Sequence, residues 1–193
     1  MNRYISYFRP VIYIVIFTLI LGFVYPLIIT MLSSVLFPVQ SHGSLVFNSN
    51  GSVAGSKIIG INFTGPQYFV GRPSATNGGP YNASWSGGSN YGPTYLPLIA
   101  KIKDRTEFWR NLGIEGEIPS DLVMASGSGL DPDISLNAAL LQVPLISKSR
   151  NISSVILESL VNVESNRQPA FFSGRYVNIF ALNKALDNLS QEV

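Results

Sequence analysis

The sequence predicts an α+β protein, with a single N-terminal transmembrane helix followed by one mixed α+β domain. Three features of the chain predict this class. A long apolar run opens the sequence, short β-branched and aromatic runs follow it, and amphipathic helical patterns fill most of the second half. Strands that precede helices, with one strand returning late, are typical of α+β domains. About 150 residues remain after the apolar run, which is the size of one ordinary domain.

The apolar run is the first element. No Lys, Arg, Asp or Glu lies between Pro10 and Ser56, and residues 11–37 are almost entirely apolar. A helix of this length reaches roughly 40 Å, which exceeds the ~30 Å hydrocarbon layer of a bilayer. We therefore predict a transmembrane helix over residues 10–37. A cleaved signal peptide is the alternative, but its apolar region is about 7–15 residues long and ends at a small-residue cleavage site.

The charges around this run predict its orientation. Arg3 and Arg9 precede the run, and no cation follows it until Lys57. Positive residues stay on the cytoplasmic side of a membrane. We therefore expect a cytoplasmic N-terminal tail over residues 1–9, a single pass through the plasma membrane, and an extracytoplasmic main domain.

Residues 38–97, after the membrane helix, divide into a linking segment, two short apolar runs and a long loop. Residues 38–54 are rich in Ser, Asn and Gly and are interpreted as a stalk or a hairpin, and the α+β domain is expected over residues 55–193. Residues 56–63 and 67–72 are short β-branched and aromatic runs bounded by Gly and Pro, which predicts two strands. Residues 72–97 contain too many Gly and Pro for regular structure. A loop of this length inside a compact domain tends to be functional.

The second half is predicted to be mainly helical, because apolar residues recur there at helical spacing. Pro144 lies within one of these patterns and is expected to kink or split its helix. A helical turn and then a short strand are expected over residues 119–125, and a further strand over residues 174–180. The expected helices lie at residues 98–112, from Ile134 or Ser135 onward, from Ser153 or Ser154 onward, and at residues 181–189.

Composition excludes several classes of function. The chain has no cysteine, so disulfides, thiolate metal sites and thiol catalysis are absent. His42 is the single histidine, which argues against a zinc site built on imidazole. The formal charge of +2 equals the contribution of Arg3 and Arg9, so the rest of the chain is balanced. A balanced domain lacks the basic face that nucleic acid requires, and we expect no nucleic-acid partner.

Two carboxylates are the strongest candidates for chemistry. Asp131 and Asp133 flank Pro132, after a Gly-rich loop and before an expected helix. Carboxylates in this position commonly cap a helix, and a ligand or partner role is the alternative. A membrane-tethered hydrolase that uses this pair is a second hypothesis. It lacks the imidazole that a Ser-His-acid triad needs, since the chain's one histidine lies in the stalk.

The long loop has the composition of a binding surface. Arg72 is the only cation between Lys57 and Lys101, which indicates a paired position. The segment 86–90 (SGGSN) can expose backbone groups, because glycine adopts positive φ. Aromatic residues bracket this segment, as expected of an interface with another protein chain or of a glycan-binding module. They are Tyr81, Trp85, Tyr91 and Tyr95.

Ordered sequence blocks identify a family resemblance. They are YFVGRPS (68–74), YNA (81–83), SGGSN (86–90), SGSGLDPDIS (126–135), AALLQV (138–143) and VNIFALNKALD (177–187). This set resembles the C subunit of the Kdp potassium-transporting P-type ATPase, the KdpC family, over nearly the whole chain. The sequence departs from the family at Asp133, where the family commonly has His, which weakens any role that needs an imidazole there.

The resemblance implies an accessory, non-catalytic subunit of an ATP-driven, high-affinity potassium uptake complex. Its implied partners are a channel-like potassium-binding subunit, a P-type ATPase subunit that carries the phosphorylated aspartate, and a small peptide subunit. It further implies a catalytic chaperone that raises the ATP affinity of the ATPase subunit, with nucleotide binding tied to Gln142. The charge pattern places Gln142 outside the cell, whereas ATP is inside.

The matching blocks also imply which residues serve the contact between subunits. We expect these residues at the interface or in support of it, and we expect no metal site and no catalytic residue. They are Arg72, Pro73, Tyr81, Ser89, Asn90, Ser128, Leu130, Asp131 and Pro132.

Overall fold

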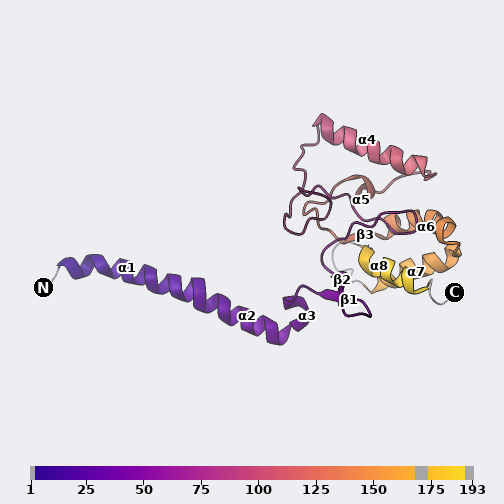
Figure 1. Cartoon of the computed structure of the whole chain (residues 1–193). Helices are drawn as coiled ribbons and strands as arrows, with labels where there is room; N and C mark the ends of the chain where they lie inside the picture. Colours follow the sequence, from indigo (N-terminus) through magenta and orange to yellow (C-terminus); the bar gives the residue numbers. More distant parts are fainter. Residues whose placement is uncertain (1–2, 168–173, 190–193) are drawn as a thin grey trace. The chain divides into compact units, whose positions relative to one another are not determined.

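A computed structural model describes residues 3–167 and 174–189 of the chain (Figure 1). The chain divides into two compact units, Met1–Leu45 and Val46–Val193. Residues 168–173 and 190–193 of the predicted domain, and residues 1–2 of the predicted tail, lie outside the described residues.

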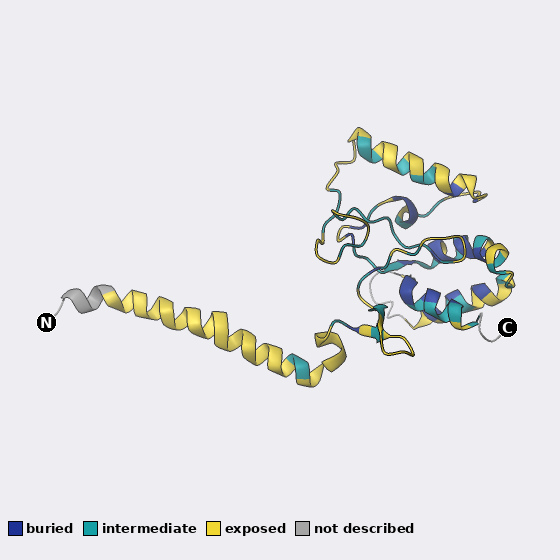
Figure 2. Ribbon diagram, in the orientation of Figure 1, coloured by how far each residue is buried: buried dark blue, intermediate teal, exposed yellow. Residues whose placement is uncertain are grey.

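The first unit is a long helix with a short helical turn after it. It contains α1 (Arg3–Leu19), a five-residue π-helix η1 (Ile20–Val24), α2 (Tyr25–Leu36) and α3 (Pro38–Ser41). The stretch Phe8–Leu36 has a mean hydropathy of 2.6 and is long and apolar enough to cross a membrane. Nearly all of it is exposed (Figure 2), as expected of a helix whose apolar surface faces lipid. The helix begins at Arg3, so residues 3–9 of the predicted tail are helical.

The π-helix ends at Val24, two residues before Pro26, which occupies the first turn of α2. Proline removes one backbone donor and its ring collides with the preceding turn of a regular α-helix. A wider turn at this point relieves that collision and lets the apolar helix continue.

The second unit contains two small sheets. Strands β1 (Leu45–Phe47) and β2 (Val53–Ser56) form one of them, and this pairing is the hairpin alternative for the predicted stalk. Strands β3 (Asp133–Ser135) and β4 (Tyr176–Asn178) form the other, antiparallel, with Ile134 opposite Val177. The late strand is therefore confirmed, in a shorter form.

Five helices of the second unit are described. They are α4 (Leu96–Asn111), α5 (Ser120–Val123), α6 (Leu136–Arg150), α7 (Ser154–Asn166) and α8 (Ile179–Leu189). The Ser135 hydroxyl accepts the Ala138 N–H at 3.1 Å and caps α6. Pro144 lies inside α6 and does not split it, which corrects that alternative. A proline costs about 3 kcal/mol inside a helix, and burial of a large apolar face on both sides of Pro144 offsets this cost.

The core lies among α6, α7, α8 and the β3–β4 sheet, which carry most of the buried residues in Figure 2. Its fully buried members include Phe69, Leu157, Val161, Leu182 and Leu186. Helix α4 is different, because Trp109 is its one buried residue and most of its surface is exposed.

The predicted strands at residues 56–63 and 67–72 are wrong. Only Ser56 of these two runs belongs to a strand, and residues 67–72 have no ladder partner. The apolar pattern of the second run places one side chain in the core, since Phe69 is 0% exposed. Two side-chain amides take the place of a neighbouring strand, as described next.

Candidate functional site

A partly buried segment, residues 68–74, leads into the long loop and is held by two amide side chains. Gln142 on α6 accepts the Val70 N–H at 2.7 Å and donates to the Val70 carbonyl at 3.1 Å. Asn183 on α8 does the same for Phe69, accepting its N–H at 2.9 Å and donating to its carbonyl at 2.9 Å. We call Gln142 and Asn183 the amide clamp. It satisfies the backbone of two consecutive residues that would otherwise be buried without partners.

The amide oxygen and both amide hydrogens of Gln142 form hydrogen bonds. Gln142 is 2% exposed, and its second amide hydrogen goes to the Ala138 carbonyl at 3.1 Å. An amide offers two donors and one acceptor oxygen, so these contacts occupy both donors. A ligand that bound Gln142 would have to break them.

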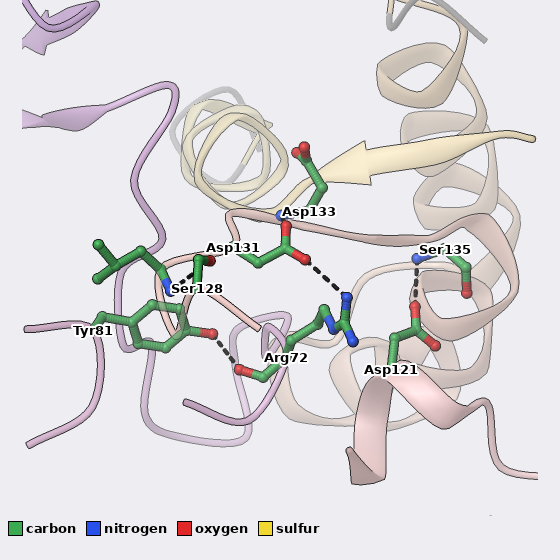
Figure 3. Close-up of polar contacts among 8 residues, drawn as sticks. Arg72, Tyr81, Asp121, Ser128, Asp131, Asp133 and Ser135 are labelled. Atoms are coloured by element: carbon green, nitrogen blue, oxygen red, sulfur yellow. Dashed lines mark hydrogen bonds and ion pairs between the residues drawn. The ribbon is translucent and has the colours of Figure 1, made fainter. Parts of the chain in front are cut away.

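A polar network that joins distant parts of the chain begins at Arg72, two residues after Val70 (Figure 3). The Arg72 guanidinium pairs with Asp131 at 2.9 Å, and each side chain is about a third exposed (30% and 27%). The Tyr81 hydroxyl donates to the Arg72 carbonyl at 2.5 Å. The other Asp131 oxygen accepts the Asp133 N–H at 3.1 Å. The ion pair confirms that Arg72 is a paired cation.

Burial shapes the electrostatics of this network. It raises the pKa of Tyr81 to about 12, helped by the nearby Asp131 carboxylate and opposed by Arg72. Burial also raises the pKa of Asp133, while its hydrogen bond with Asn178 at 2.9 Å acts in the opposite direction. The Arg72 Nε is buried and has no hydrogen-bond partner among the described residues.

The Gly-rich loop 126–132 contributes mainly backbone groups. The Ser128 carbonyl accepts the Gly87 N–H at 2.8 Å, and the Leu130 carbonyl accepts the Gly60 N–H at 2.8 Å. The Ser128 hydroxyl accepts the Leu130 N–H at 3.1 Å, which fixes the loop's own turn. Two further bonds, from Ser126 to the Pro73 carbonyl at 3.2 Å and from Ile179 to the Pro132 carbonyl at 2.9 Å, tie the loop to its neighbours.

Most of the residues implied by the resemblance therefore meet in one place. The structure brings together Arg72, Pro73, Tyr81, Ser128, Leu130, Asp131 and Pro132. We call this set the loop-base network. Ser89 and Asn90 lie in the loop itself, and Asn90 is exposed with a φ of 53°.

Several members of the site carry no strong signal in the sequence. Ser74 accepts the Tyr81 N–H at 2.9 Å and donates to the Gly129 carbonyl at 2.8 Å. Asp121 accepts the Ser135 N–H at 2.6 Å and so fixes the start of α6 (Figure 3). Asn183 lies in a matching block but was not singled out. Its one signal in the sequence is a polar residue at helical spacing among apolar residues.

The long loop also carries aromatic side chains that are open to solvent. Trp85 is 41% exposed, Tyr91 36% and Tyr95 51%. The Tyr91 and Tyr95 rings pack with centroids 5.0 Å apart, and the Lys101 ammonium lies 5.1 Å from the Tyr91 centroid. Large exposed aromatics on a fixed loop are typical of protein–protein contact surfaces.

The carboxylate pair does not form a catalytic arrangement. Asp131 is engaged with Arg72, and Asp133 faces Asn178. Within residues 3–167 and 174–189, no group of three or more His, Asp or Glu side chains could hold a metal ion. Neither carboxylate caps α6, since Ser135 performs that role.

Comparison with known proteins gives a consistent result. The sequence model of the family "K+-transporting ATPase, c chain" matches residues 8–188. A potassium-transporting ATPase KdpC subunit from Methanosphaerula palustris is 47% identical over 169 residues, covering 88% of this chain and 89% of the relative. The KdpC subunit from Methylococcus capsulatus is 46% identical over 189 residues, covering 96% of this chain and 99% of the relative.

Proposed function

The chain belongs to the KdpC family and is a non-catalytic subunit of the Kdp potassium-uptake ATPase complex, and from this premise we propose that its second unit is an extracytoplasmic docking module. One observation carries the proposal. The loop-base network anchors Arg72, Tyr81 and Gly87 of a loop that presents Trp85, Tyr91 and Tyr95 to solvent. A preorganised aromatic surface binds with a smaller entropic cost than a mobile one.

The proposed orientation follows from the charges beside the apolar helix. Arg3 and Arg9 precede it, and the next cation is Lys57. This bias puts the N-terminus in the cytoplasm and the second unit outside. The channel-like potassium-binding subunit then becomes the proposed partner of the loop at residues 72–97, which we call the aromatic loop. The ATPase and small peptide subunits complete the complex.

The amide clamp bears on the proposed chaperone effect. If this subunit raises the ATP affinity of the ATPase subunit, we propose that it does so through contact between subunits. Gln142 is buried and its amide is engaged by Val70 and Ala138, which supports a structural role for it. It holds the segment that leads to Arg72, and through that segment it positions the loop.

The docking proposal is tested by removing the exposed aromatics. We expect Trp85→Ser with Tyr95→Ser to lower recovery of the partner subunits with the tagged chain at least about tenfold, since interface aromatics each contribute ~2 kcal/mol or more. Val155→Ser is the matched control, because Val155 is 74% exposed on α7 and lies outside the loop. It should leave recovery unchanged.

Variants of the loop-base network provide a second test of the docking proposal. Arg72→Ala and Asp131→Ala each leave one charged partner without its ion pair, and both should lower subunit recovery and the potassium-stimulated ATPase rate. Unchanged recovery and rates in the aromatic double variant and in both network variants would refute the docking role.

A further inference from the structure

A small pocket beside the start of the second unit has an unusual charge lining. Its volume is about 220 Å³, and Lys57, Arg167 and Lys184 line it together with the Asn188 side chain. Among its described lining residues, Glu164 is the one carboxylate. Apolar residues complete the lining, namely Val46, Phe180, Ala181 and Ala185.

The single carboxylate is already neutralised. Glu164 is 4% exposed and pairs with Arg167 at 2.5 Å. Lys57 and Lys184 form no ion pair with any described residue, and the Lys184 ammonium donates to the Phe47 carbonyl at 3.2 Å. Two lysines without an ion pair among the described residues therefore line the pocket, in a unit whose total charge is balanced.

The pocket is also close to the membrane helix along the chain. Val46, its first lining residue, is the first residue of the second unit. Residues 37–45 connect it to Leu36, the last residue of the apolar stretch. A fully extended chain spans about 3.3–3.6 Å per residue, so the connection from Leu36 to Val46 is at most roughly 36 Å long. A tether of this length gives a high effective concentration of lipid headgroups at the pocket.

We propose that this Lys57–Lys184 pocket binds the negatively charged phosphate group of a phospholipid headgroup. Two ammonium groups can donate charge-assisted hydrogen bonds to phosphate oxygens, and the Asn188 amide offers a further donor. The apolar lining suits the glycerol and acyl carbons next to the phosphate. This inference rests on membrane anchoring and does not depend on the aromatic loop, so the two proposals fail separately.

The test uses the full chain in a neutral detergent. Bound lipid is counted by native mass spectrometry during titration with phosphatidylglycerol or, as the net-neutral lipid, phosphatidylcholine. We expect phosphatidylglycerol to bind more tightly, and Lys57→Gln with Lys184→Gln to weaken its binding at least about tenfold. Lys103→Gln with Lys148→Gln is the matched control and should bind as the native chain does, because both lysines are exposed and lie outside the pocket.

A parallel titration with inorganic phosphate distinguishes the source of the ligand. Lipid binding that millimolar phosphate does not displace supports a headgroup site. Displacement by phosphate at such concentrations, lost in the Lys57→Gln/Lys184→Gln variant, would show a free-anion site and overturn the assignment to lipid. Equal phosphatidylglycerol binding by the native chain and this variant, with unchanged melting temperatures, would overturn the pocket itself.

Discussion

Replacing Gln142 by methionine is the most informative single change in this chain. Methionine matches the length of glutamine and keeps the volume of α6's buried face, but it cannot make the three hydrogen bonds to Val70 and Ala138. A hydrogen bond contributes about 0.5–1.5 kcal/mol net, so their loss should lower the free energy of unfolding by about 3 kcal/mol. For a unit of this size that corresponds to a fall in melting temperature of about 6–12 °C.

Thermal unfolding of the purified chain in detergent, followed by circular dichroism, measures this shift. Gln67→Met is the matched control, because Gln67 is exposed and its side chain lies outside the clamp. It should change stability by less than about 0.5 kcal/mol.

The same variant separates a structural from a nucleotide-binding role for Gln142. In complexes that still assemble at low temperature, the ATP concentration for half-maximal activity should stay within about twofold of the native value. An unchanged melting temperature combined with a large rise in that concentration would refute the clamp and support direct contact with nucleotide.

Two further predictions concern Tyr81 of the loop-base network and Gly129 of the neighbouring Gly-rich loop. Tyr81→Phe removes the hydrogen bond to the Arg72 carbonyl and should cost about 1 kcal/mol near neutral pH. Because the folded pKa of Tyr81 is raised to about 12, its contribution is fully present below the unfolded value near 10 and is lost as pH rises through 12. Chemical denaturation should therefore show a smaller native–variant difference at pH 12 than at pH 9, and a constant difference would contradict the burial of this hydroxyl. Gly129→Ala should cost about 1–3 kcal/mol, since its φ is +69° and a Cβ there would lie 2.7 Å from the Gly87 carbonyl oxygen. Gly92→Ala, where a Cβ meets nothing within 4 Å, is the control, and equal melting temperatures for these two variants would refute the packing described around Gly129.

Much of the fold could be predicted from the sequence because it depends on local patterns. The apolar helix has no charge along its length, and Ser135 opens α6 through a bond to a residue three positions away. The run at 67–72 shows the limit of this reasoning. The pattern predicted a strand there, but an apolar pattern does not specify which groups satisfy the backbone.

The clamp could not be predicted because its partners are distant in sequence. Gln142 lies 72 positions from Val70, and Asn183 lies 114 positions from Phe69. No spacing rule brings them together, and a buried amide on a helix looks like any other polar residue in an otherwise apolar pattern. For the same reason the sequence indicated that Arg72 is paired but did not identify Asp131 as its partner.

The orientation of the second unit is the central claim, and the absence of native cysteine makes it directly measurable. Ser84 is exposed in the aromatic loop, so a Ser84→Cys variant can be labelled in intact cells with a membrane-impermeant maleimide. Asn2→Cys, which precedes the apolar helix in the chain, serves as the internal comparison. The account predicts labelling of Ser84→Cys without permeabilisation and of Asn2→Cys only after it. The reverse pattern would place the second unit in the cytoplasm and contradict the docking module proposed for it.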